Sequence, residues 1–272
     1  MSITDTKPAV VLIHGLWVSA LSWEHWAERY RARGYEVVAR GWPGMEGDLE
    51  ALRADPSGLD EIGVAEVLDH YTEIIGALDQ PPIIMGHSFG GAFVQVLLDR
   101  GLGAVGVGID ASAVKGVTKL PLSTLRAASS GLNNPKNRHR SIDMTADEFH
   151  YAFTNTLDDE AATAAYERYA APGPGKVLFE GALANLTRHS PLTVDFDKAD
   201  RAPLLLIAGG DDHVVPASID QQTLKKYKNS ESVVDYKEFP GRSHFTIGQP
   251  GWEEVADYAL DWAESHLPAV TR

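Results

Sequence analysis

The stretch Gly86-His87-Ser88-Phe89-Gly90 decides the fold of this chain. It follows an apolar run, Ile83 to Met85, and precedes a segment with helical character. A serine at a sharp strand-to-helix turn adopts strained backbone angles that expose its hydroxyl, and its neighbours must be small so that strand and helix can approach. The glycines at 86, 90 and 91 meet that requirement. We therefore predict that Ser88 is a nucleophile on such a turn.

An acid and a base follow Ser88 in the order Ser, Asp, His. Asp212 comes shortly after a short apolar run, Leu204 to Ala208, which reads as a buried strand. His244 lies in the loop after a looser strand pattern, Val233 to Phe239. Since catalytic groups in parallel sheets collect at the carboxyl ends of the strands, we expect these three side chains on one rim. The sequence thus predicts a Ser-Asp-His triad.

The first strong strand pattern, Pro8 to Ile13, ends in His14-Gly15-Leu16-Trp17. With these motifs the chain resembles the α/β-hydrolase superfamily over nearly its whole length, in particular its cap-bearing, esterase-like branch. The resemblance implies that Ser88 is the nucleophile, His244 the base and Asp212 the orienting acid. It also implies an oxyanion hole made by the N–H groups of Leu16 and Phe89. We assign Trp17, the next residue of that loop, to the substrate pocket.

Strand and helix patterns alternate along most of the chain, which is typical of a doubly wound, mostly parallel α/β sheet. Few residues precede the first strand, so we expect about six strands and the first two strands of the full hydrolase sheet missing. The alternation of strands and helices stops within residues 114–200, where the pattern predicts successive helices. Thr145 begins a capping box, and Asp158 or Asp159 is expected to cap a second helix. We therefore expect a hydrolase core at 1–113 and 201–272, with a helical cap at 114–200.

Composition limits the function further. The net charge of −14 is expected to repel nucleic acid and anionic membranes, so neither is predicted as a partner. The absence of cysteine excludes a disulfide framework and a thiolate nucleophile. No His-Glu-x-x-His motif occurs, so no metal is predicted, and no cofactor is expected. The amino terminus holds no apolar signal core, and a cytoplasmic location is the default expectation. The oligomeric state is left open.

The predicted function is that of a carboxylesterase-like serine hydrolase. Its substrate is a small to medium, largely apolar carboxylic ester or lactone, cleaved through an acyl-enzyme on Ser88. Two alternatives stay open. One is non-ester chemistry on the same fold: carbon–carbon hydrolase, hydroxynitrile lyase, perhydrolase or cofactor-free dioxygenase. The other is a non-catalytic small-molecule-binding module. Asp110 is an alternative to Asp212 as the acid, because it too ends a strand pattern; we prefer Asp212 and expect Asp110 to order the start of the cap.

Overall fold

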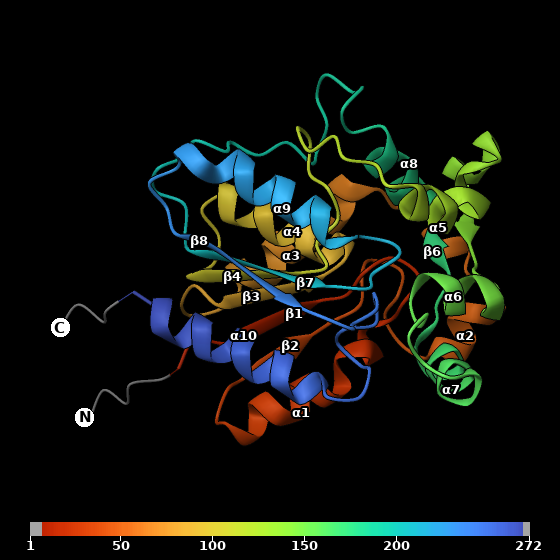
Figure 1. Ribbon diagram of the computed structural model, residues 1–272, viewed down its shortest axis with the longest axis horizontal. Coiled ribbons are helices and arrows are strands. Elements are labelled where there is room, and N and C mark those ends of the chain that lie inside the picture. Colours follow the sequence, from red (N-terminus) through yellow and green to blue (C-terminus); the bar gives the residue numbers. More distant parts are fainter. Residues whose placement is uncertain (1–6, 269–272) are drawn as a thin grey trace.

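A six-stranded parallel sheet forms the centre of the computed structural model, which describes residues 7–268 (Figure 1). The spatial order of the strands is β2-β1-β3-β4-β7-β8. Within the described residues the sheet thus has the six strands that the sequence predicts, all running in one direction. Their bounds are β1 Val10–Ile13, β2 Val37–Ala39, β3 Ile83–His87, β4 Val105–Ile109, β7 Leu204–Gly209 and β8 Val234–Phe239.

Side chains alternate between the two faces of the sheet, and both faces are covered. In β1, Val10 and Leu12 pack into one hydrophobic cluster, whereas Val11 and Ile13 pack into the other. Because every residue of this strand is buried, its sequence is a continuous apolar run rather than an alternating one. For this reason the strand could be predicted from the apolar run Pro8 to Ile13, although its residues do not alternate between apolar and polar.

Helices on opposite sides close these two clusters (Figure 1). Two helices, α1 and α10, contribute Trp26 and Val255 to one cluster, and three others contribute Val67, Phe93 and Ile219 to the second. The arrangement is the doubly wound one expected from the alternating pattern. The helices are α1 Glu24–Ala32 and α10 Trp252–His266 on one face, and α3 Val64–Gly76, α4 Phe89–Asp99 and α9 Ala217–Lys226 on the other.

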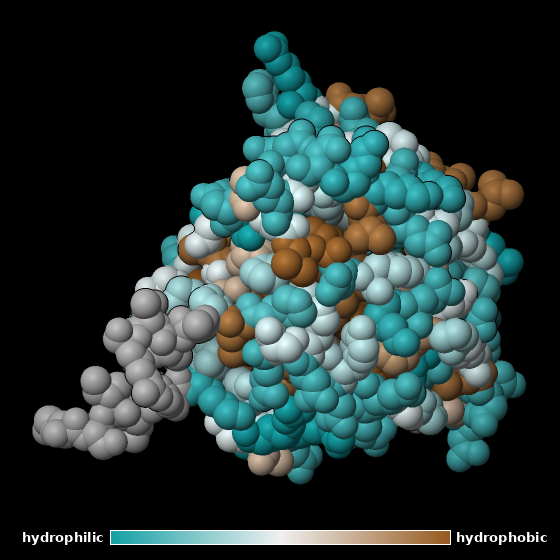
Figure 2. Space-filling view, turned by 60° about the vertical axis from the view of Figure 1, so that its left-hand side comes forward, coloured by the Kyte–Doolittle hydropathy of each residue, from teal (hydrophilic) through white to brown (hydrophobic). Residues whose placement is uncertain are grey.

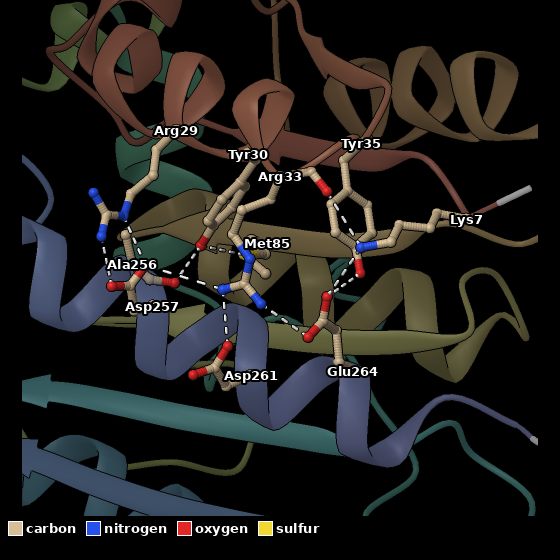
Figure 3. A network of polar contacts seen from close by, with 10 residues as sticks. All are labelled: Lys7, Arg29, Tyr30, Arg33, Tyr35, Met85, Ala256, Asp257, Asp261 and Glu264. Carbon is tan, nitrogen blue, oxygen red and sulfur yellow. Dashed lines mark hydrogen bonds and ion pairs between the residues drawn. The ribbon is translucent and has the colours of Figure 1, made fainter.

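Polar contacts join α1 to α10 (Figure 3). The guanidinium of Arg29 donates to Asp257 at 2.6 Å. Buried Tyr30 donates its hydroxyl to the carbonyl of Ala256 at 2.7 Å. Exposed ion pairs stabilise little, but a buried hydroxyl must be hydrogen-bonded to avoid a desolvation cost. The Tyr30 contact therefore fixes the register of the two helices.

Between β4 and β7 the chain leaves the sheet and forms most of the right-hand side of Figure 1. Thr145 forms the predicted capping box with Glu148, and Asp158 caps the following helix. One detail differs from an all-helical segment: Ser141–Ile142 and Gly173–Pro174 form a short antiparallel pair, because two extended turns meet there. The elements are α5 Leu122–Leu132, η3 Pro135–His139, β5 Ser141–Ile142, α6 Ala146–Ala152, α7 Asp159–Tyr169, β6 Gly173–Pro174 and α8 Gly175–Ala182.

The division into a core and a cap at 114–200 stays a prediction, and we use "cap segment" below for residues 114–200. The remaining short elements lie in loops of the core and were not predicted. They are η1 Ala20–Trp23, α2 Leu49–Ala54, η2 Ser57–Leu59 and η4 Tyr227–Asn229. None of the helices within residues 7–268 is both long and apolar enough to cross a membrane.

Candidate active site

Ser88 stands at the turn between β3 and α4 in a strained conformation, with φ 57° and ψ −120°. Only glycine fits on either side of this turn. A Cβ added at Gly86 would overlap the carbonyl of Gly90, and one added at Gly90 would overlap the carbonyl of Ile13. Because backbone atoms cannot give way as a flexible side chain can, the glycines are required for β1, β3 and α4 to meet here. Strain of this kind is characteristic of functional sites.

Asp212 and His244 form a hydrogen-bonded pair, with 2.6 Å between Asp212 Oδ2 and His244 Nδ1. Both residues are buried. The second carboxylate oxygen of Asp212 accepts the N–H groups of Val214 at 2.6 Å and Val215 at 2.8 Å. Burial raises the pKa of Asp212, and these N–H groups oppose that rise. The carboxyl group is thereby held in one orientation against the imidazole.

The other nitrogen of His244, Nε2, is buried and has no hydrogen-bond partner among residues 7–268. Nδ1–H donates to Asp212, so in the neutral ring Nε2 carries the free lone pair. Burial lowers the pKa of His244 below its ordinary value, which keeps the ring neutral at physiological pH. An unpaired buried nitrogen with a free lone pair is what a general base requires.

His87, the neighbour of Ser88, connects the nucleophile turn to the loop of His244. Its Nε2–H donates to the backbone carbonyl of His244 at 2.7 Å, and the two rings lie 4.6 Å apart. Phe153 of the cap segment packs edge-on against His244, with the ring centroids at 4.8 Å. The residue next to Ser88 thus contacts His244 although 157 positions separate the two histidines, and a hydrogen bond between Ser88 and His244 Nε2 is not formed. This positioning role of His87 was not predicted.

Two backbone N–H groups are free to bind an anion beside Ser88. That of Leu16 has no acceptor within the described part of the chain. That of Phe89 lies in the first turn of α4, where no carbonyl of the helix can reach it. The Leu16 loop comes close to the serine, because a Cβ added at Gly15 would lie 2.7 Å from Ser88 Cβ. The positive end of α4 adds to the attraction for a developing oxyanion.

A mostly apolar cavity of about 180 Å³ opens above Ser88, between the core and the cap segment. Trp17, assigned to the substrate pocket from the sequence, is among its lining residues, as are Leu16 and Phe89. Trp17 also has a positive φ of 65°, as the tight loop requires. The other side chains around the cavity include Leu120, Leu125, Phe153, Leu178 and Val215.

Three polar lining residues escaped the sequence analysis: Ser112, Lys119 and Thr124. The hydroxyl of Thr124 is buried and has no partner within residues 7–268. No motif marks these positions, since only the approach of the cap segment to the core makes them neighbours of Ser88. Conversely, Leu122 and Leu183 of the cap segment do not line the cavity and are exposed at 83% and 46%.

Asp110, the alternative acid, lies at the end of β4 with a positive φ of 46°. Its Oδ1 accepts the N–H of Gly209 at 2.6 Å, which ties it to the end of β7, the strand that leads to Asp212. Burial and the neighbouring charge of Asp212 raise the pKa of Asp110 well above its ordinary value. The hydrogen bond to Nδ1 of His244 is made by Asp212 and not by Asp110.

Within the described residues, His87, Asp110 and His244 could each offer one ligand atom to a metal ion, with these atoms within 4.8 Å of one another. Two of the four imidazole nitrogens are already engaged, Nδ1 of His244 by Asp212 and Nε2 of His87 by a carbonyl. A cation here would also lie against the proposed base. Of this group only His244 belongs to the proposed triad, and the absence of a metal stays a prediction from the sequence.

Comparison with known proteins finds relatives along nearly the whole chain. Residues 10–258 match the alpha/beta hydrolase family. The chain is 27% identical to a monoacylglycerol lipase of Mycolicibacterium smegmatis, over 97% of this chain and 90% of that protein.

Solved structures share the fold. The monoacylglycerol lipase of Paleococcus ferrophilus superposes with a TM-score of 0.64 at 21% identity, covering 96% of both chains. A pyrethroid hydrolase from Sphingobium faniae gives a TM-score of 0.66 at 20% identity, covering 96% of this chain and 98% of that one. The strained serine turn, the six parallel strands and the match over residues 10–258 lead to one conclusion: this chain belongs to the alpha/beta hydrolase family.

Proposed function

We propose that the protein is a carboxylesterase-like serine hydrolase that cleaves small to medium, largely apolar carboxylic esters or lactones. One observation carries the proposal. His244 holds Asp212 through Nδ1 at 2.6 Å and keeps Nε2 buried and unpaired, beside a serine in a strained turn that opens on an apolar cavity. An ester as the substrate is supported by two relatives, of which one is named a monoacylglycerol lipase and the other a pyrethroid hydrolase.

The proposed reaction has two steps. In the first, Nε2 of His244 takes the proton of Ser88 while Oγ attacks the ester carbonyl, and the N–H groups of Leu16 and Phe89 stabilise the oxyanion. The alcohol then leaves with the proton from His244, and an acyl-enzyme remains. In the second step His244 activates water, which releases the acid and restores Ser88. Asp212 orients the imidazole and stabilises its cationic form throughout.

The size of the cavity supports a modest substrate. An apolar cavity of ~150 Å³ can bind benzene, and this one has about 180 Å³. We therefore expect one side of the ester to be an apolar group somewhat larger than a benzene ring. A cytoplasmic location, expected from the sequence, stays a prediction.

Reaction with a fluorophosphonate probe, followed by turnover on a panel of esters, lactones and aryl ketones, tests the proposal. We expect labelling at Ser88 and ester turnover that falls between about 10³-fold and 10⁶-fold in Ser88→Ala. Labelling without turnover of any ester or lactone would favour the non-ester chemistries of the fold. An unlabelled, folded protein would favour a binding module, and full activity of Ser88→Ala would refute the serine mechanism.

A further inference from the structure

Five exposed leucines gather on the cap segment. Eight large hydrophobic residues are exposed in the described part of the chain, and the other three lie outside the cap segment. Single exposed leucines are ordinary, but a contiguous group marks an interaction site. The five, with their exposed fractions, are Leu120 (61%), Leu122 (83%), Leu125 (42%), Leu183 (46%) and Leu186 (83%).

Two of these leucines line the catalytic cavity and the other three lie within four residues of lining residues in sequence; we call the five the leucine rim. Leu120 and Leu125 line the cavity together with Gly181 and Ala182, which directly precede Leu183. Helix α5 packs beside α8 (Figure 1).

Two hydrogen bonds of Asn185 hold the loop before α5 against the turn that carries Leu186. The N–H of Gly116 donates to Asn185 Oδ1, and Asn185 Nδ2 donates to the carbonyl of Val117, both at 2.7 Å. The five leucines thus belong to one surface. The face shown in Figure 2 is mostly hydrophilic, with a hydrophobic patch near its centre and further hydrophobic residues at its upper and right-hand margins.

The charge around the leucine rim is opposite to that of the whole chain. Residues 111–142 contain no acidic residue, and residues 171–194 contain only Glu180. Lys119 lines the cavity entrance and makes no ion pair within residues 7–268. Acidic side chains approach these stretches away from Lys119: Glu66 pairs with Lys176, Glu61 lies near His139, and Asp147 and Glu148 share a surface hollow with Arg126. The basic residues of the two stretches are Lys115, Lys119, Arg126, Lys136, Arg138, Arg140, Lys176 and Arg188.

The net charge of −14 therefore hides a strong separation of charge. The cap segment as a whole holds ten basic and eleven acidic residues, so it is residues 111–142 and 171–194, and not the whole cap segment, that escape the repulsion of anionic membranes. Anionic lipid surfaces are bound by a combination of two kinds of side chain. Apolar side chains enter the acyl layer, and basic side chains contact the head groups. A second copy of this chain fits less well, because two basic faces would repel each other.

We propose that the leucine rim docks on an anionic lipid surface, with the entrance of the catalytic cavity facing that surface. Docking would bury Leu122 and Leu186 and bring Lys119 and Arg188 to the head groups. An ester dissolved in the lipid could then enter the cavity without crossing water. The docking itself does not depend on catalysis, so it can be measured in the absence of turnover.

Co-sedimentation with vesicles tests the proposal. The vesicles are pure phosphatidylcholine or phosphatidylcholine with about a third phosphatidylglycerol. We expect the protein to bind the anionic vesicles, and this binding to weaken as salt is added. The double variant Leu122→Ser/Leu186→Ser should bind at least about tenfold more weakly, since transfer of two leucine side chains from water is lost. Neither residue lines the cavity, so hydrolysis of a short soluble ester should stay unchanged.

Two control variants complete the design. Leu21→Ser alters an exposed leucine of the core and should bind vesicles as the unaltered protein does. Ser88→Ala should also bind normally, which separates failure of docking from failure of the proposed function. Equal binding by the double variant, or no binding to anionic vesicles, would overturn the proposal. Binding that does not depend on lipid charge or on salt would also overturn the proposal. So would a dimer of the unaltered protein in solution that the double variant does not form.

Discussion

The carboxyl edge of the sheet and the cap segment both form walls of one cavity, but they are built in different ways. At the sheet edge Ser88, Asp212 and His244 are at most 4% exposed, and hydrogen bonds or backbone contacts fix each of them. On the cap side Leu120 and Leu125 line the same cavity while being 61% and 42% exposed. The difference teaches that the side chains we propose for the chemistry lie in the buried wall, whereas the cap side, which we expect to select the substrate, is much more exposed.

Among the changes that test this comparison, the largest effect is expected from Asp212→Asn, which keeps the shape of the side chain but removes the charge that orients His244. Turnover of a p-nitrophenyl ester should fall by up to ~10⁴-fold, because the wrong imidazole tautomer becomes favoured. In the matched variant Asp110→Asn the amide oxygen can still accept the N–H of Gly209, so we expect less than about a tenfold loss. The reverse result would make Asp110 the acid.

Rigidity of the sheet edge is tested by Gly86→Ala, measured by urea unfolding. A Cβ at this position overlaps backbone atoms of α4, so the free energy of unfolding should fall by about 3 kcal/mol, and the variant could fail to fold. Gly76→Ala is the control, because a Cβ there meets no atom within 4 Å. In a helix this change should raise stability by roughly 0.5–1 kcal/mol. Equal tolerance of both changes would contradict the tight turn.

The pH dependence of turnover reports on the buried pair. His244 must be neutral to accept the proton of Ser88, and burial lowers its pKa from the usual 6.5. Activity should therefore rise with pH through a midpoint below 6.5, and the enzyme should be nearly fully active at pH 7. Values of kcat/KM between pH 4 and 8 give this midpoint for the free enzyme. A midpoint above 6.5 would show that the imidazolium is stabilised instead.

The smallest effect is expected on the cap side. Leu125→Ala enlarges the cavity entrance, so the ratio of kcat/KM for a bulky and a short ester should change by about 10-fold, the usual range for one or two methylene groups. The rate of fluorophosphonate labelling of Ser88 should hardly change. Leu122→Ala, in the same helix but outside the cavity, is the control. A labelling rate that collapsed in Leu125→Ala would mean that the cap also positions the catalytic groups.

The sequence allowed the fold and the buried wall to be predicted because their signals are local. Glycines around Ser88, apolar runs for β1, β3 and β7, and the capping box at Thr145 each act through neighbouring residues. The other wall could not be predicted, because Thr124 and Lys119 reach the cavity only through the packing of α5 on the core. The same holds for His87, whose role depends on a carbonyl 157 residues away.

The ends of the sheet show how the protein avoids joining its strands to those of other molecules. With six strands, the sheet exposes β2 and β8 as edges, and unpaired edges are templates for aggregation. β2 has only three residues and is followed by Trp42 and Pro43, so it offers little backbone to a foreign strand. β8 carries Asp235, Lys237 and Glu238, and charged side chains discourage pairing. Both edge strands thus discourage pairing with strands of other molecules, also when heating loosens the surrounding loops.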